Sequence, residues 1–407
     1  MHVLYLHQHF STPKGAAGIR SYEMARGLLR NNHSVTMVCG KFGPGNTGLE
    51  TPFVKGRREG LVDGIRVIEF EVAYSNKLSF FQRSMQFMKF ASRSLKVALT
   101  EDYDLIFASS TPLTAAIPGI CARWLRRKPF VFEVRDLWPE LPKAMGAISN
   151  PLILGAMSVL AWAAYKSAIR IVGLAPGMVD GIEKWGVPRS RIAMVPNGCD
   201  NGIFAGASPD AWRPGSVGSG DLLAVYTGTH GAANGLMALV EAATELKRRK
   251  RDDIKILLVG DGLEKLALQA KARERGLDNL LFLDPINKSR IAQLLAGADV
   301  GIQSLANIPE FYFGTSPNKF FDYIAAGLPV LCNYPGWLAG MIEMHHCGYA
   351  VPPDNADALA DALEAAAADK AGLRRMGQNG RKLAEGQFDR KLLVDQWLGW
   401  VVDGKHP

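Results

Sequence analysis

The sequence predicts an α/β protein made of two doubly wound, Rossmann-like domains that face a central cleft. Short, β-branched apolar runs alternate with segments of helical period, which is the pattern of β-α-β units and parallel sheets. Many of these runs lack period-two alternation, as expected of strands covered by helices on both faces. The 407 residues, of which 48% are hydrophobic, are too many for one ordinary core and suit two domains.

The first half of the chain, residues 1–200, is expected to form the first domain. Its apolar runs are separated by turn residues and, in several places, by helix-period segments. Strands are expected at residues 3–6, 34–38, 65–70, 105–108, 130–134, 169–173 and 192–195, and helices at 21–30 and 118–126.

The second half repeats this scheme and is expected to form a second domain over residues 221–385. Residues 201–220, which are rich in Gly, Ser and Pro, are expected to be a linker between the two. Strands are expected at residues 222–227, 254–259, 280–283, 300–303 and 330–333, and helices at 237–248, 264–274, 289–297, 319–326 and 356–367.

Composition narrows the class of partner. The formal net charge of +8 indicates an anionic partner such as nucleic acid, an acidic lipid surface or a phosphate-rich substrate. The five cysteines are dispersed without metal-ligand spacing, which fits a reducing cytoplasm. The first ten residues indicate a strand rather than a signal peptide, and no apolar run is long enough to span a bilayer. The longest mostly apolar stretch, residues 152–164, is expected to be a buried core helix.

The most informative segment is TSPNKFFDYIAAGLPVL, in which a kinked polar opening precedes a helix. Lys319 supplies a cation for a phosphate, and Asp322, one turn into the helix, supplies a carboxylate for ribose hydroxyls. The segment therefore indicates a site for a nucleoside diphosphate. Its candidate binding residues are Ser316, Pro317, Asn318, Lys319 and Asp322.

Two glycine-containing loops follow predicted strands and open helices. In STPKGAAGI, Gly15 and Gly18 allow close approach of the backbone to a phosphate, or simply shape a βα turn. The second loop, TGTHGAANGL, is neither a Walker loop nor a good dinucleotide fingerprint. Its backbone amides are expected to face a diphosphate, and its histidine either donates to a phosphate or caps a turn. The residues concerned are Gly228, Thr229, His230 and Gly231.

The segment FEVRDLWPE places charged residues at the end of a predicted strand. Asp136 is a candidate catalytic group that orients or deprotonates an acceptor hydroxyl. The alternative is a salt bridge between Asp136 and Arg135. Arg135 and Arg20 are the candidates for contact with the acceptor or a phosphate.

Residues 78–99 combine large apolar side chains with basic ones. A basic amphipathic helix with aromatic residues suits an anionic bilayer surface. The equally open alternative is a helix packed on the core with a solvated basic face.

Together these motifs resemble the retaining, nucleotide-sugar-dependent glycosyltransferases of family four, which have the GT-B fold. The resemblance covers almost the whole chain, and the branch that looks nearest builds bacterial capsule, O-antigen and colanic acid and includes the N-acetyl-L-fucosamine transferases. It is carried by PKGAAGIRSYEMARGL, EVRDLWPE, MVPNGCDNGIF, YTGTHGAANGL, LLVGDG and SPNKFFDYIAAGLPV, in that order.

The resemblance implies roles for individual residues. Asp322 stands at the second glutamate of the family's two-glutamate motif and should bind ribose, while Lys319 should face the donor diphosphate. Asp136 falls where many relatives carry a catalytic-site His or Asp. The resemblance also implies that no catalytic metal or other cofactor is needed, that the acceptor attacks from the leaving group's own side, and that a C-terminal helix, about 386–407, packs back on the first domain.

The sequence departs from the family pattern at three points. The first glutamate of the two-glutamate motif falls on Gly314, and the second is the shorter Asp322. The glycine loop after residue 227 lacks the Arg and Lys that many relatives place there. These departures shift the expected phosphate contacts to Lys319, His230 and backbone amides.

The expected activity is transfer of a sugar, including the N-acetylated amino or deoxy type, from a UDP-linked donor to a lipid-pyrophosphate-linked saccharide in surface polysaccharide synthesis. The protein is expected to lie peripherally on the anionic, cytoplasmic face of the cell membrane. Alternatives are a transferase with a soluble acceptor and a UDP-sugar 2-epimerase of similar fold. The weak glycine fingerprint speaks against a nicotinamide-linked oxidoreductase, and no binding motif supports a nucleic-acid partner.

Overall fold

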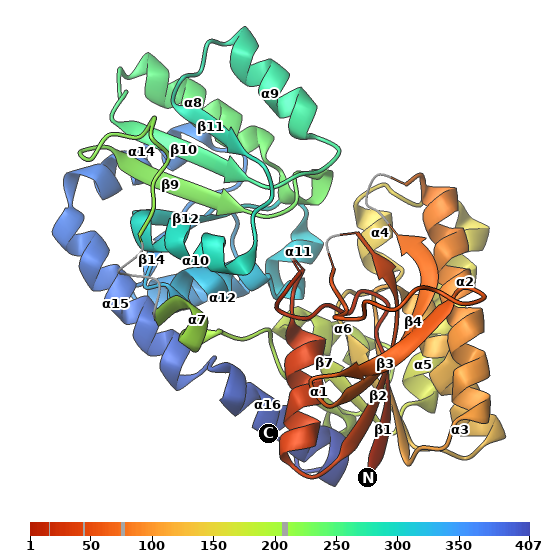
Figure 1. Ribbon diagram of the computed structural model, residues 1–407. Helices are drawn as coiled ribbons and strands as arrows, with labels where there is room; N and C mark the ends of the chain where they lie inside the picture. Colours follow the sequence, from red (N-terminus) through yellow and green to blue (C-terminus); the bar gives the residue numbers. More distant parts are fainter. Residues whose placement is uncertain (16, 44, 75–77, 206–210) are drawn as a thin grey trace. The chain divides into compact units, whose positions relative to one another are not determined.

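The chain folds into two compact units, each built around one sheet (Figure 1). The computed structural model describes residues 1–15, 17–43, 45–74, 78–205 and 211–407. The first unit comprises Met1–Pro196, Gly314–Ser316 and Lys391–Pro407, and the second comprises Asn197–Phe313 and Pro317–Arg390. The α/β class and the two Rossmann-like domains are thereby confirmed.

The first unit contains an eight-stranded sheet in the order β3-β4-β2-β1-β5-β6-β7-β8. All neighbours pair in parallel except β3 and β4, which are antiparallel. The strands are β1 (His2–Leu6), β2 (Ser34–Phe42), β3 (Arg57–Val62), β4 (Ile65–Tyr74), β5 (Leu105–Ser109), β6 (Phe130–Val134), β7 (Arg170–Gly173) and β8 (Ile192–Met194).

Helices cover both faces of this sheet. Figure 1 shows α2, α3 and α5 side by side, and their contacts place α2 on α3 and α3 on α5. The helices of the first unit are α1 (Arg20–Arg30), α2 (Phe80–Thr100), α3 (Ala116–Leu125), α4 (Glu140–Ala144), α5 (Pro151–Ser167), α6 (Pro176–Lys184) and most of α16 (Arg390–Leu398).

The C-terminal segment belongs to the first unit because its aromatic side chains pack there. Trp397 is fully buried, with its ring centroid 6.0 Å from that of Tyr5 and 4.9 Å from that of Phe107. Arg170 donates to the carbonyl oxygens of Trp400 and Val401, at 3.0 and 2.9 Å. The last residues of the chain therefore complete the core of the unit that its first residues begin.

The second unit contains a six-stranded, all-parallel sheet in the order β11-β10-β9-β12-β13-β14. Its strands are β9 (Leu222–Thr227), β10 (Ile254–Val259), β11 (Leu280–Leu283), β12 (Val300–Gln303), β13 (Val330–Cys332) and β14 (Gly348–Ala350). Its helices are α7 (Asn201–Ala205), α8 (Met237–Arg248), α9 (Lys265–Glu274), α10 (Lys288–Gly297), α11 (Pro309–Gly314), α12 (Asn318–Ala325), α13 (Trp337–Met344), α14 (Ala356–Ala368) and α15 (Lys370–Gly386).

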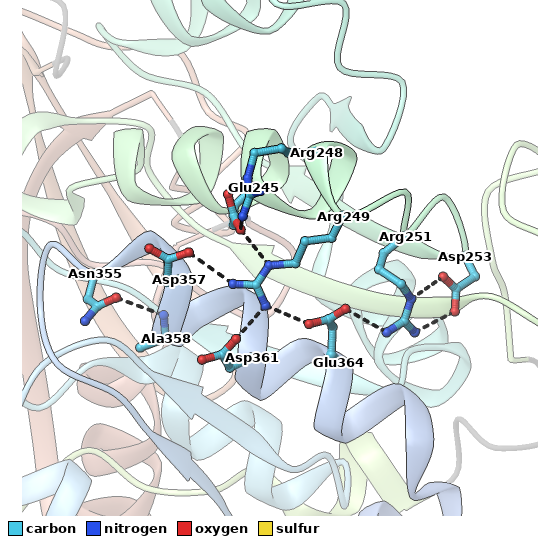
Figure 2. A network of polar contacts seen from close by, with 10 residues as sticks. All are labelled: Glu245, Arg248, Arg249, Arg251, Asp253, Asn355, Asp357, Ala358, Asp361 and Glu364. Atoms are coloured by element: carbon cyan, nitrogen blue, oxygen red, sulfur yellow. Dashed lines mark hydrogen bonds and ion pairs between the residues drawn. The ribbon is translucent and has the colours of Figure 1, made fainter.

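Helices α8 and α14 pack on one another against β9 and β10, and a charge network joins their exposed edges (Figure 2). Arg249, just past the end of α8, pairs with Asp357, Asp361 and Glu364 of α14. Arg251 pairs with Glu364 at 3.0 Å. Because Asp357 and Asp361 are exposed to solvent, the contribution of the network to stability depends on ionic strength.

The expected linker at residues 201–220 is not a link between the units. The chain passes from the first unit to the second between Pro196 and Asn197. Residues 201–205 form α7, and residues 206–210 lie outside the described residues. The backbone N–H of Trp212 donates to the carbonyl of Gln293 at 3.0 Å, and the Arg290 guanidinium lies over the Trp212 ring, 4.1 Å from its centre. Trp212 and Arg213 therefore lie on the second unit, because Trp212 contacts α10 and Arg213 pairs with Asp299.

Helix α5 is not the fully buried core helix that its composition suggests. Leu152 is 82% exposed and Trp162 is 54% exposed, while Ala161, Ala164 and Tyr165 face the core. The helix is apolar all round, so periodicity does not reveal which side is covered. Among the described residues, no helix is long and apolar enough to cross a membrane.

Candidate functional site

Two strand ends in the second unit approach each other so closely that only glycine fits. Gly228 (φ +153°) follows β9, and Gly260 (φ +149°) follows β10. A Cβ on Gly260 would lie 1.8 Å from the carbonyl oxygen of Gly228, and one on Gly262 would lie 2.2 Å from that of His230. The glycine loop is thus fixed at the carboxyl edge of the sheet, where ligands of such sheets bind.

The loop presents fewer free amides than the sequence suggested. Gly228 donates its N–H to the carbonyl of Val259, and His230 donates its N–H to that of Asp261, both at 2.9 Å. These two amides hold the loop against β10 and are not available to a diphosphate. The expectation that the whole stretch 228–231 cradles phosphate through its amides is corrected to that extent.

His230 is fully buried and neutral. Burial, assisted by the charge of Lys265, lowers its pKa to about 4. Its ring lies between those of Tyr226 and Phe282, and neither ring nitrogen has a hydrogen-bond partner among the described residues. The imidazole therefore offers at most one neutral N–H to a ligand and no positive charge.

Lys319 supplies a cation at this edge of the sheet. Its Nζ lies 3.3 Å from Oδ1 of Asn234 and 4.8 Å from the centre of the Tyr226 ring, and its Cε lies beside Gly228. Within the described part of the chain it forms no ion pair with a carboxylate. Burial lowers its pKa to about 8. A half-buried ammonium beside the N-terminus of α12, without a counter-ion, creates a place where an anion is favoured.

Asp322 lies one turn further along α12 and is held by a second lysine. Lys288 Nζ donates to both carboxylate oxygens of Asp322, at 2.6 and 2.8 Å. Burial raises the pKa of Asp322, and the charge of Lys288 opposes this rise. The structure thus places on one short helix a cation for a diphosphate, Lys319, and a carboxylate for a ribose, Asp322.

The residues that open this helix are divided between the units. Pro317 is the N-cap residue of α12 and Asn318 is its first residue. By its contacts Ser316 falls in the first unit, whereas Pro317 and Asn318 belong to the second. Thr229 follows Gly228 in the loop, and its carbonyl accepts a hydrogen bond from the Tyr226 hydroxyl at 2.9 Å.

In the first unit, Arg20 has a structural role rather than the expected contact with acceptor or phosphate. Its guanidinium, 2% exposed, pairs with the fully buried Glu133 at 2.8 Å. The same group donates to the carbonyls of Pro196 and Val195, at 2.6 and 2.9 Å. Because these partners and burial enclose the guanidinium, Arg20 is not presented to a ligand.

The first glycine loop has one buried and one exposed glycine. A Cβ on Gly15 would lie 2.3 Å from Ser11 Oγ and 2.7 Å from the amide nitrogen of Asn46, so the position requires glycine for packing. Gly18 is exposed and precedes α1. Ala16 lies outside the described residues.

Asp136 and Arg135 do not form the salt bridge considered from sequence, as judged from the described ion pairs. Asp136 accepts a hydrogen bond from the Thr111 hydroxyl at 2.9 Å, and burial raises its pKa. Arg135 Nη1 lies 3.2 Å from Nε2 of His7. Since arginine only donates, His7 accepts at Nε2 and carries its proton on Nδ1, 2.8 Å from Ser21 Oγ.

Sequence reasoning missed the polar residues directly after β1. The amide of Gln8 is fully buried and has no hydrogen-bond partner among the described residues. Burial lowers the pKa of His9 to about 3, and that of His7 well below its ordinary value. The signal was available, because His-Gln-His ends a buried strand and the carboxyl edge of a parallel sheet is where ligands bind.

Comparison with known proteins agrees with this arrangement. Residues 213–383 match the model of the glycosyl transferases group 1, and residues 15–198 match that of the glycosyl transferase 4-like domain. The two matches together span most of the chain. Each half of the chain thus matches a glycosyltransferase family model.

A curated relative of this glycosyltransferase is D-inositol 3-phosphate glycosyltransferase of Nocardia farcinica. The two are 30% identical over 206 residues, which is 48% of this chain and 44% of the relative. The match therefore spans less than half of the relative's length.

Solved structures resemble the glycosyltransferase over its full length. Sucrose-phosphate synthase from Thermosynechococcus elongatus aligns with a TM-score of 0.74 at 19% identity, covering 97% of both chains. HepE of Anabaena in complex with UDP and glucose aligns with a TM-score of 0.67 at 18% identity, also over 97% of both. WaaG, a glycosyltransferase involved in lipopolysaccharide biosynthesis, aligns with a TM-score of 0.69 at 15% identity. The alignment covers 99% of this chain and 100% of WaaG. At these identities the likeness is one of fold, and it matches the GT-B architecture expected from the sequence.

Proposed function

We propose that the protein transfers a sugar, with retention, from a UDP-sugar to a lipid-linked saccharide in the synthesis of a surface polysaccharide. The observation that carries the donor half of this proposal is Lys319, a half-buried cation without a carboxylate partner in the described structure. A half-buried charge of this kind is costly unless a ligand neutralises it. The diphosphate of a nucleotide sugar supplies two negative charges where the N-terminus of α12 and Lys319 favour them.

The mechanism follows from where charge develops. Breaking the anomeric bond leaves negative charge on the departing diphosphate, and Lys319 with the dipole of α12 stabilises that charge as it forms. In this proposal the acceptor oxygen attacks from the side of the leaving group, whose phosphate helps to take the proton. Asp136, with its raised pKa, orients the acceptor hydroxyl. Asp322 binds the ribose hydroxyls of the donor.

UDP is the proposed leaving group, and the HepE structures, which contain UDP, glucose or UDP-glucose, support this choice of base. The test is calorimetric titration of the protein with UDP, GDP and ADP, followed by transfer assays with UDP-sugars. UDP should bind most tightly of the three. Failure of all three nucleotides to bind would overturn the donor assignment. Incubation with the donor alone separates transfer from epimerisation, because a 2-epimerase converts the sugar nucleotide without an acceptor.

The acceptor half of the proposal rests on a basic apolar face formed by α2, α3 and α5. Residues 78–100, 116–128 and 151–167 contain nine Lys and Arg residues and no Asp or Glu. Several large apolar side chains are exposed on these three helices, which pack side by side (Figure 1). They are Phe81, Met85, Met88, Trp124, Leu125, Leu152, Val159 and Trp162.

This combination suits the headgroup region of an anionic bilayer, because the apolar side chains enter the interface while the basic ones meet acidic lipids. The exposure of these apolar side chains favours binding to a membrane over the alternative of a helix whose aromatic side is fully covered. WaaG, described as involved in lipopolysaccharide biosynthesis, gives further support. Sucrose-phosphate synthase, of the same fold, keeps a soluble acceptor open as the second candidate.

Sedimentation with vesicles distinguishes the two candidates. The protein should sediment with phosphatidylglycerol-containing vesicles at low salt and much less with pure phosphatidylcholine. The double variant Phe81→Ser/Trp162→Ser should lose most of this binding. Leu266→Ser is the matched control, since Leu266 is an exposed leucine of α9 in the second unit. No binding of the wild-type protein at low salt would refute the membrane proposal and favour a soluble acceptor.

A further inference from the structure

Lys288 is the only described cation within ion-pair distance of Asp322. It is the first residue of α10, whose N-terminus is fixed by Asn287, since the Asn287 side chain accepts from the backbone N–H of Arg290 at 2.9 Å. The Nζ atom of Lys288 lies over the ring of Phe204, 5.3 Å from its centre. The ammonium group is therefore held in place before any ligand arrives.

The same ammonium group lies between two buried acids. It contacts both oxygens of Asp322 and lies 3.6 Å from Asp200 Oδ2. Asp200 has its own cation, because Arg390 Nε donates to its other oxygen at 2.8 Å. The side chains of Asp322 and Asp200 are only 13% and 6% exposed, so water screens their mutual repulsion weakly.

We propose that Lys288 is a positioning residue that fixes and keeps ionised the carboxylate that selects ribose, and so sets the preference for ribonucleotides. This inference rests on the proposed role of Asp322 in the nucleotide-sugar site. By contacting both oxygens, Lys288 sets the plane of the carboxylate, and each oxygen keeps a lone pair for a ribose hydroxyl. Without Lys288, the charge of Arg390 still acts on Asp322, but Arg390 is paired with Asp200, and Asp322 faces the negative charge of Asp200.

The experiment compares UDP with 2′-deoxy-UDP as probes, using calorimetric titration of the full chain. In the wild-type protein UDP should bind about tenfold or more tightly than 2′-deoxy-UDP, because the 2′-hydroxyl donates a hydrogen bond to a charged acceptor. In Lys288→Met this ratio should fall to within about threefold of unity, chiefly through weaker binding of UDP. Lys288→Arg should keep most of the preference.

Asp322→Asn supplies the other corner of a double-mutant cycle. In that background Lys288→Met should change the ratio little, because the carboxylate that it positions is gone. A wild-type ratio in Lys288→Met, or tighter UDP binding in that variant, would overturn the proposal. If Lys288→Met fails to fold, as judged by its thermal melt, the test passes to Lys288→Arg. Loss of the preference for UDP in Lys288→Arg would then overturn the proposal. Failure of the wild-type protein to bind UDP at all would instead refute the proposed function on which this inference rests.

Discussion

Replacing Lys319 by methionine tests the central physical claim about the donor site. Methionine keeps much of the apolar stem and removes the charge. The burial that lowers the Lys319 pKa from its ordinary value to about 8 corresponds to about 3 kcal/mol, at 1.36 kcal/mol for each pKa unit. That free energy is the cost of keeping an unneutralised ammonium there, and a bound diphosphate recovers it. We expect turnover at saturating donor to fall roughly a hundredfold or more, because charge stabilisation of the leaving group is lost.

In the ligand-free protein, the same substitution should not be harmful to stability. Removing a half-buried charge that has no carboxylate partner among the described residues should leave the free energy of unfolding at pH 7 unchanged or higher. The folded-state pKa lies below the unfolded one, so the penalty is fully present below pH 8 and is relieved as pH rises from about 8 towards 10.5. The affinity of the wild-type protein for UDP should fall as pH rises through 8, and that of Lys319→Met should stay flat over this range.

The assays are steady-state turnover at saturating donor, calorimetric titration with UDP from pH 6.5 to 9.5, and a thermal melt. Lys271→Met is the matched control, since Lys271 pairs with Glu274 on the surface of α9, at 3.0 Å. Near-wild-type turnover of Lys319→Met at saturating donor would refute the reasoning, as would a UDP affinity that is independent of pH above 8 in the wild-type protein.

Four further changes test other parts of the structure. Gly260→Ala places a methyl group 1.8 Å from the carbonyl oxygen of Gly228 and at an unfavourable φ, so it should abolish UDP binding and lower the melting temperature. Glu133→Gln leaves a buried arginine without its counter-ion and should lower the free energy of unfolding by about 3–5 kcal/mol in urea titration. Wild-type stability should fall as pH drops from about 6.5 to about 4, because unfolding lets His230 take up a proton; His230→Phe should remove about 3 kcal/mol of that fall. Arg249→Gln should lower the melting temperature at low salt, and the difference should shrink in 1 M salt because the network is exposed (Figure 2).

Each of these expectations has a contrary outcome that the same assay reports. A Gly260→Ala protein that binds UDP normally would mean that the loop relaxes without cost. Wild-type stability of Glu133→Gln would show that the buried arginine finds enough carbonyl acceptors. If His230→Phe loses as much stability at acid pH as the wild-type protein, acid unfolding would be assigned to other groups, such as His7 and His9. A salt-independent effect of Arg249→Gln would show that packing, rather than charge, explains the loss.

Much of the fold could be predicted from local patterns. The strands at 222–227, 254–259, 280–283 and 300–303 begin and end where the sequence indicated, because a strand buried on both faces is a continuous apolar run. β3 was missed, since it is a charged edge strand that water covers on one side. Its signal was Asp63-Gly64, where both residues have positive φ and close the hairpin to β4.

The sequence identified candidate donor-site residues where the role of a residue depends on its neighbours along the chain. Gly228, Lys319 and Asp322 lie in local strand–loop–helix patterns, and the structure brings Lys319 to Gly228 and places Asp322 on the same helix. Arg20 failed as a candidate ligand because its partner Glu133 is 113 residues away. The backbone amides of Gly228 and His230 were likewise wrong candidates for phosphate binding. Their hydrogen-bond acceptors lie at the end of the neighbouring strand, β10.

By itself, the amino-acid sequence determined the two α/β domains, the glycine turns and the short helix with its lysine and carboxylate, because periodicity and backbone freedom are properties of short segments. Only the tertiary structure decided which charges are already neutralised. It pairs Arg20 with Glu133 and Asp322 with Lys288, and it leaves Lys319 without a carboxylate among the described residues. Electrostatic free energy depends on distance and burial in space, and neither can be obtained from separation along the chain.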